Sequence, residues 1–227
     1  MSKNLKITSI CMKTVVIIAA VVGIILSAIQ SSEAFMGGSR VFMYFTIQSN
    51  IFIALVCLVG LILIIAKKTS NLWNIIKFVA TISITLTGLV FCFVLAPTMW
   101  NAAWSLPNIL THVVVPICAI IDLFLISNVT NYNKFDVIHV IVPPILYACY
   151  AFIGYQLKWQ FAPGVNYPYF FLNWGSKAGA FGFSNELPYM GTMWWILFLL
   201  FLLIGLGFLY LRIIRFIKSK NIQKSAE

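Results

Sequence analysis

Residues 193–211 read MWWILFLLFLLIGLGFLYL, an apolar run without a charged side chain. A helix needs about 20 mostly apolar residues to cross the hydrocarbon core of a bilayer, so this run predicts a transmembrane helix. The whole chain has the same character: 62% of its 227 residues are hydrophobic, 9% are charged, and the mean hydropathy is +0.99. Soluble domains carry roughly 25% charged residues. The composition excludes a soluble globule and predicts one integral membrane domain over residues 1–227.

Six stretches of the sequence are long and apolar enough to span a bilayer. They cover about 14–29, 42–66, 72–95, 108–126, 137–156 and 193–214. Their apolar residues are continuous and do not alternate with polar ones, which favours helices over the strands of a membrane barrel. We therefore expect an all-α fold, a polytopic bundle of six transmembrane helices.

The basic residues indicate how the bundle is oriented. With the N-terminus in the cytoplasm, 12 of the 15 Lys and Arg residues fall on the cytoplasmic side, and Arg40, Lys158 and Lys177 fall on the outer side. Basic residues accumulate in cytoplasmic segments, so both termini are predicted to be cytoplasmic, in a cell membrane. The basic side is expected to contact anionic lipid headgroups. These short clusters form no groove that could follow a nucleic acid.

One connection, residues 157–192, is much longer than the others and rich in aromatic residues. Two interpretations stay open. It could be an interfacial aromatic belt, because Trp and Tyr are enriched at membrane surfaces. It could equally be a lid or re-entrant segment over the outer mouth of the bundle, because long loops in compact proteins are usually functional.

Ionisable residues at membrane depth are rare and need an explanation. Asp122 and His139 lie on consecutive predicted spans at equal distances from the turn between them, so an antiparallel hairpin would place them at one depth. We interpret them mainly as a structural polar pair, with a second functional site as the alternative. His112 lies about one helical turn inside the outer end of the fourth span. Pro116 cannot bond the carbonyl of His112, so the helix should be locally open there.

Polar residues of the second span lie at the same depth as His112. Thr46, Ser49 and Asn50 share one helix face, and Asn108 shares a face with His112. Small polar residues often join helices by hydrogen bonds, which is the simpler interpretation. The alternative is chemical: a hydroxyl beside an imidazole is the minimum needed for nucleophilic acyl transfer.

Metals and cofactors are not indicated by this sequence. The chain has two histidines at different depths and five cysteines without a CxxC spacing. Metal sites and haem normally require ligands that converge on one point. We predict neither a metal site nor a cofactor.

Three motifs together resemble the androgen-induced protein and TFPI-regulating protein family of six-span membrane proteins, and most of all its bacterial "Pr-six-Pr" members. They are Tyr44-Phe45-Thr46-Ile47-Gln48-Ser49-Asn50, the stretch Leu110-Thr111-His112 with Pro116 and Asp122 after it, and Tyr167-Pro168-Tyr169-Phe170-Phe171-Leu172-Asn173. The animal members hydrolyse fatty acid esters of hydroxy fatty acids with a threonine nucleophile and a histidine base. The resemblance implies that Thr46 is the nucleophile and His112 the base.

The implied activity is hydrolysis of a lipid ester near the outer membrane face, with membrane lipids or lipid esters as partners. Ser49, Asn50 and Asn108 are candidate donors to the oxyanion. Two alternatives stay open: a non-catalytic bundle that binds a lipid or small molecule, and a proton-coupled carrier that uses Asp122 and His139 as a relay.

Overall fold

The computed structural model describes residues 3–29, 38–99, 103–126, 130 and 132–224. In these residues the regular structure is helical apart from two isolated β-bridges, and six stretches are long and apolar enough to cross a membrane. They cover Lys3–Ala28, Phe45–Ile65, Asn71–Met99, Leu106–Leu125, Lys134–Gln156 and Thr192–Asn221. The predicted all-helical bundle is confirmed, and the chain is a multi-pass membrane protein.

The first, second and last spans are continuous helices: α1 (Lys3–Ala28), α2 (Phe45–Ile65) and α8 (Thr192–Lys224). Helix α1 begins at Lys3, before the predicted start near residue 14. Helix α8 continues to Lys224, past its predicted end near residue 214. Both extensions carry lysines, which are good helix formers but lower the local hydropathy. Hydropathy therefore located the most apolar part of each helix and missed these basic extensions.

Each of the other three spans contains an irregular segment. The third span consists of α3 (Asn71–Val90), the π-helix η2 (Phe91–Leu95) and α4 (Ala96–Met99). The fourth consists of α5 (Leu106–Ile109), the π-helix η4 (Leu110–Val114) and α6 (Val115–Leu125). The fifth consists of the 3₁₀-helix η6 (Lys134–Ile141) and α7 (Val142–Gln156). In every case a proline, Pro97, Pro116 or Pro143, follows two residues after the irregular segment ends. Proline has no backbone N–H, so the regular hydrogen-bond ladder cannot continue through these points.

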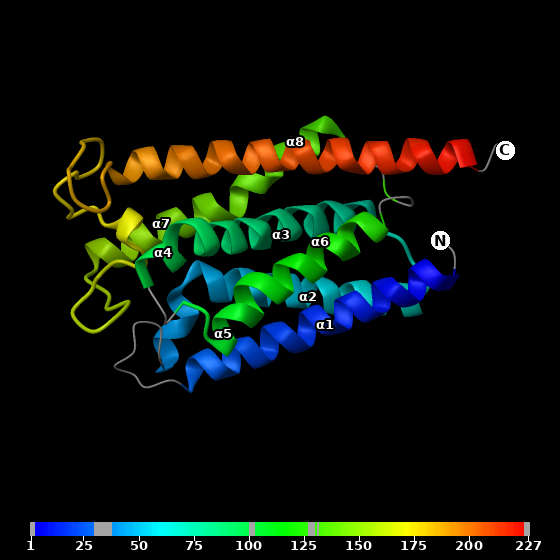
Figure 1. Cartoon of the computed structure of the whole chain (residues 1–227), viewed down its shortest axis with the longest axis horizontal. Helices are drawn as coiled ribbons and strands as arrows, with labels where there is room; N and C mark the ends of the chain where they lie inside the picture. Colours follow the sequence, from blue (N-terminus) through cyan, green and yellow to red (C-terminus); the bar gives the residue numbers. More distant parts are fainter. Residues whose placement is uncertain (1–2, 30–37, 100–102, 127–129, 131, 225–227) are drawn as a thin grey trace.

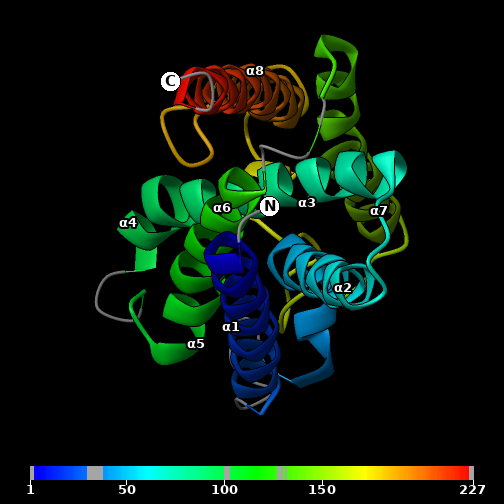
Figure 2. The ribbon, with the colours of Figure 1, turned by 90° about the vertical axis from the view of Figure 1, so that its right-hand side faces the viewer.

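Helix α3 lies at the centre of the bundle, between two layers (Figures 1 and 2). On one side it packs against α2 and α6, which in turn contact α1. On the other side it packs against η6 and α8 through large apolar side chains such as Phe78, Val137 and Leu203. This central position explains why α3 is the most buried of the six spans.

The long connection between α7 and α8 covers one end of the bundle, which we call the capped end. Its residues Phe161, Tyr169 and Phe171 are buried against Tyr44 and Tyr147, which belong to the bundle itself. The connection includes the short 3₁₀-helix η7 (Phe170–Leu172). It is therefore a folded cover over the helices. The start of α1 and the end of α8 lie together at the opposite end, which we call the terminal end (Figure 1).

Candidate active site

Thr46 and His112 meet below the capped end. Thr46 lies in the first turn of α2, and His112 lies in the π-helix η4. The Thr46 Oγ1 atom is 3.3 Å from Nε2 of His112. Both side chains are buried, with 4% and 5% of their surface exposed. The expected contact between these two distant positions is present, while their catalytic roles remain a prediction.

The surroundings of His112 determine which ring nitrogen carries the proton. Its Nδ1 atom is 3.0 Å from the carbonyl oxygen of Asn108, which can only accept a hydrogen bond. The Thr111 hydroxyl also lies 3.1 Å from Nδ1, but it donates to the Pro107 carbonyl and so can only accept here. We therefore assign the proton to Nδ1. This leaves the lone pair of Nε2 facing the Thr46 hydroxyl, as a general base requires.

Two irregular helical segments hold the imidazole in place. Phe91, the first residue of π-helix η2, stacks on the His112 ring with centroids 3.9 Å apart and planes 18° apart. A Cβ atom on Gly88 would lie 2.8 Å from the carbonyl oxygen of His112, so only glycine allows α3 to approach η4 this closely. The local opening that Pro116 predicts is realised as the π-helix itself. Such segments are frequently found at functional sites.

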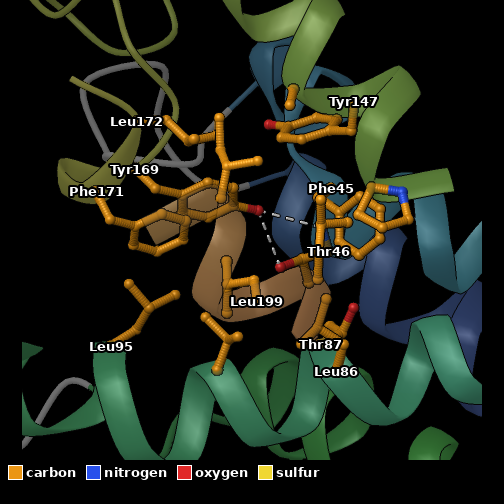
Figure 3. A pocket seen from close by; sticks show the side chains of 15 residues that line it. Phe45, Thr46, Leu86, Thr87, Leu95, Tyr147, Tyr169, Phe171, Leu172 and Leu199 are labelled. Carbon is orange, nitrogen blue, oxygen red and sulfur yellow. Dashed lines mark hydrogen bonds between the residues drawn. The ribbon is translucent and has the colours of Figure 1, made fainter. Parts of the chain in front are cut away.

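Tyr169, from the covering connection, completes a chain of hydrogen bonds. Its hydroxyl oxygen accepts from the Thr46 backbone N–H at 3.2 Å and lies 3.4 Å from Thr46 Oγ1 (Figure 3). Burial raises the pKa of the Tyr169 phenol above its ordinary value, which keeps it neutral and able to donate. The direction of donation therefore runs from Tyr169 to Thr46 and from Thr46 to His112.

The sequence did not identify Tyr169 as a site residue. It lies within one of the three motifs that carried the resemblance, and in a segment whose placement the sequence left open between belt, lid and re-entrant loop. An aromatic residue in an aromatic-rich loop gives no signal of its own, because the loop has three tyrosines and its fold decides which of them is buried beside Thr46. This residue could be found only from the tertiary structure.

The three predicted oxyanion donors are already engaged elsewhere. Ser49 Oγ donates to the Thr46 carbonyl at 3.0 Å, and Asn50 Nδ2 donates to the carbonyls of Thr46 and Thr111 at 2.7 and 3.1 Å. Asn108 Nδ2 donates to the Ala103 carbonyl at 2.9 Å. These contacts are supporting ones: Ser49 and Asn50 fix the first turn of α2, and Asn108 fixes the start of the helix that carries His112. Donation by any of the three side chains to an oxyanion stays a prediction.

A narrow apolar cavity of about 60 Å³ lies next to Thr46. Thr46, Thr87 and the two tyrosines Tyr147 and Tyr169 are the polar members of its wall, and the remaining wall is apolar (Figure 3). The apolar lining comes from α2, α3, η2, α7, η7 and α8: Phe45, Leu86, Val90, Leu95, Pro144, Ala148, Phe171, Leu172, Ile196, Leu199 and Leu200. His112 does not itself line the cavity, so Thr46 is the member of the pair that a molecule in the cavity would contact directly.

The predicted pair of Asp122 and His139 is not formed. Asp122 is fully buried and accepts from Lys13 Nζ at 2.7 and 2.9 Å, from Ser9 Oγ at 2.5 Å, and from Lys77 Nζ. His139 is exposed, and its Nδ1 lies 3.2 Å from the Asp136 carbonyl. Lys13 and Lys77 are two of the twelve basic residues that the sequence places on the cytoplasmic side. Both are buried inside the bundle, and their ammonium groups satisfy the carboxylate in place of His139.

Within the described residues, no group of three or more His, Cys, Asp or Glu side chains could hold a metal ion. No family model, curated protein sequence or solved structure matches the chain.

Proposed function

We propose that this multi-pass membrane protein hydrolyses lipid esters, with Thr46 as nucleophile and His112 as general base. The observation that supports this proposal is the chain of hydrogen bonds from Tyr169 through Thr46 to His112 and on to the Asn108 carbonyl, beside an apolar cavity. A nucleophile, a base and a group that orients the base are the parts that covalent acyl transfer needs. These roles are also the ones implied by the family resemblance.

In the first half of the reaction, Nε2 of His112 takes the hydroxyl proton as Thr46 Oγ1 attacks the ester carbonyl carbon. The carbonyl oxygen becomes an oxyanion, and the Tyr169 hydroxyl, 3.4 Å from Thr46 Oγ1, is placed to donate to it. The C–O bond to the alcohol then breaks, and the alcohol leaves with the proton from His112. The acyl group remains on Thr46.

In the second half, water attacks the acyl-threonine while His112 accepts a proton from it. Collapse of the intermediate releases the carboxylic acid and returns the proton to Thr46 Oγ1, which restores the starting state. The apolar wall of the cavity suits the acyl chain next to the carbonyl, and it excludes water from the hydrogen bonds at the reacting atoms.

A fluorophosphonate probe tests the proposal, because it reacts covalently with an activated hydroxyl. We expect the purified protein to be labelled, and labelling to disappear in Thr46→Ala and His112→Ala while the thermal unfolding temperature shows that both are folded. Thr46→Ser should retain labelling because it keeps the hydroxyl. Thr98→Ala is the matched control, since Thr98 is an exposed threonine whose hydroxyl donates to the Leu95 carbonyl of the same span.

The outcomes separate the alternatives. Labelling that persists in both Thr46→Ala and His112→Ala would exclude these roles. A folded protein that is never labelled but binds a lipid ester would be a non-catalytic binding bundle. A carrier would instead lose a pH-dependent flux in Asp122→Asn without any change in labelling.

We also propose that both termini face the cytoplasm of a bacterial cell and that the active site lies near the outer membrane face. Burial of Lys13 and Lys77 leaves ten basic residues on the terminal side against three on the other, which preserves the bias. Reporter fusions after the last residue and within residues 157–192 test this orientation. An active periplasmic reporter at the C-terminus would overturn it.

A further inference from the structure

The charged cluster at the terminal half of the bundle is not electrically balanced. Lys13 and Lys77 are 3% and 4% exposed, and both bind the single buried carboxylate of Asp122. Ser9, the fourth member of the cluster, is neutral. Two ammonium groups and one carboxylate leave one excess positive charge among side chains that are almost fully buried. An unbalanced buried charge is strongly unfavourable unless another group compensates it.

A cavity of about 340 Å³ opens beside this cluster, and its lining adds further positive charge. Lys13 and Lys77 form part of its wall, together with Lys6, Lys67 and Lys68. Among the described residues that line it, none is acidic. The cavity is therefore a basic pocket whose inner wall carries the excess charge.

Two further features of the wall favour an anion. The N–H of the Trp73 indole is buried and has no hydrogen-bond acceptor within the described part of the chain. The pocket also reaches the N-terminus of α3, because Ser70, the N-cap residue, and Asn74 line it. The first turn of a long helix carries partial positive charge from its backbone N–H groups.

The shape of the pocket depends on Gly60. A Cβ atom at this position would lie 2.8 Å from Cε of Lys13, so the aliphatic part of Lys13 passes directly over the glycine backbone. This close passage lets the ammonium group reach both Asp122 and the wall of the pocket. The small residue is therefore part of how the site is built.

We propose that this pocket binds a phosphate group, either free or on a lipid headgroup. Phosphate presents several charged oxygens that separate ammonium groups and an indole N–H can share, and lysine is a common phosphate ligand. The pocket lies between the last turns of α2 and the first turn of α3. Gly60, which lines it, is about 21 Å of helix rise from Thr46 along α2. Basic pockets between spanning helices at this level bind anionic headgroups. The pocket is thus separate from the proposed hydrolase site.

The first experiment titrates the purified protein, in a detergent without phosphate, with inorganic phosphate by calorimetry or ³¹P NMR. We expect saturable binding. Lys67→Gln/Lys68→Gln should weaken phosphate binding about tenfold, because it removes two positive charges from the wall of the pocket. Both side chains are exposed, so folding should be retained. The matched control is Lys134→Gln/Lys220→Gln, which removes the same charge from two other exposed lysines and should change binding less than about twofold.

A second variant tests the inner wall of the pocket. Trp73→Phe removes the indole N–H while keeping an aromatic ring, and it should weaken phosphate binding about fivefold if that N–H donates to the anion. A purely structural role for Trp73 would lower thermal stability without a change in phosphate affinity.

Native mass spectrometry distinguishes a lipid headgroup from a soluble phosphate as the ligand. The protein is released for this measurement from nanodiscs of phosphatidylglycerol or of phosphatidylcholine. Retention of phosphatidylglycerol that is lost in Lys67→Gln/Lys68→Gln identifies a lipid headgroup. Saturable binding of inorganic phosphate without retained lipid identifies a soluble phosphate. The proposal is overturned if neither binds, or if the pocket variant and the control variant weaken binding equally.

Discussion

The buried polar side chains at the two ends of this bundle are stabilised in different ways, by neutral hydrogen bonds at one end and by ion pairs at the other. Near the capped end, Thr46, His112 and Tyr169 are neutral and are held by backbone carbonyls, by an aromatic stack and by distorted helices. Toward the terminal end, Lys13, Asp122 and others form a charged cluster held by ion pairs across three regular helices. Ion pairs hold helices together, whereas a neutral imidazole that accepts from a neighbouring hydroxyl can take its proton in a reaction. We therefore expect mutations at the two ends to separate activity from stability.

The largest effect on activity is expected at His112. His112→Gln keeps a polar side chain of similar reach but cannot act as a base, so labelling and ester hydrolysis should fall about 10²–10⁴-fold. His139→Gln is the matched control, since His139 is exposed and lies far from Thr46 in the sequence. The wild-type rate should also fall at acidic pH, because a protonated imidazole cannot accept the Thr46 proton. Equal rates in His112→Gln and wild type would contradict the assigned role.

The largest effect on stability is expected at Asp122. Asp122→Ala leaves two buried lysines without a carboxylate and should destabilise the protein by about 3–5 kcal/mol, measured by chemical or thermal unfolding in detergent. The triple replacement Lys13→Met/Asp122→Leu/Lys77→Met removes all three charges at once and should be far less destabilising. Labelling per folded molecule should be unchanged in both. A loss of labelling in the folded triple variant would show that the two ends are coupled.

A smaller effect on activity is expected at Tyr169. Tyr169→Phe removes the hydroxyl that is placed to donate to the oxyanion, and hydrolysis should fall about 10²–10³-fold with stability nearly retained. Tyr167→Phe in the same connection is the control. If both variants lose the same activity, the connection acts as a cover and the Tyr169 hydroxyl has no specific role.

The smallest effect is expected at Gly88, and it tests how tightly the distorted helices are packed. Gly88→Ala places a methyl group against the His112 carbonyl and should cost about 1–3 kcal/mol of stability, together with part of the labelling rate. Gly205→Ala is the control, because nothing lies within 4 Å of its added Cβ. Equal stability of the two variants would mean that η4 can move away from α3 freely.

Several parts of the candidate site could be read from the sequence. Thr46 and His112 were placed at one depth because each lies near an end of an apolar run, and runs of known length fix depth in a bilayer. Pro116 indicated a helix distortion because a missing N–H is a property of the residue itself. The supporting roles of Ser49 and Asn50 could not be read, since their donors could turn to either a ligand or a backbone carbonyl.

The charged residues were harder to interpret than the apolar ones. The sequence indicates that Asp122 needs a partner, and it favours His139 because the two residues lie on consecutive spans at equal distances from the turn between them. The count of basic residues places Lys13 and Lys77 on the cytoplasmic side with ten others, and it says nothing about which of them turn into the bundle. Both lysines pair with Asp122 because the faces of three helices are adjacent in the bundle. Which helix faces are adjacent cannot be read from the sequence around each lysine.

The sequence alone determined that the chain forms six membrane-spanning helices, because continuous apolar runs of this length are stable only when they satisfy their backbone hydrogen bonds within lipid. It also determined that the helix carrying His112 would be distorted near Pro116, because the missing N–H of proline acts locally. The tertiary structure decided which polar side chains meet: Tyr169 with Thr46, and Lys13 with Asp122. Those contacts depend on how helices rotate and how a long connection folds back, and packing over the whole molecule sets both.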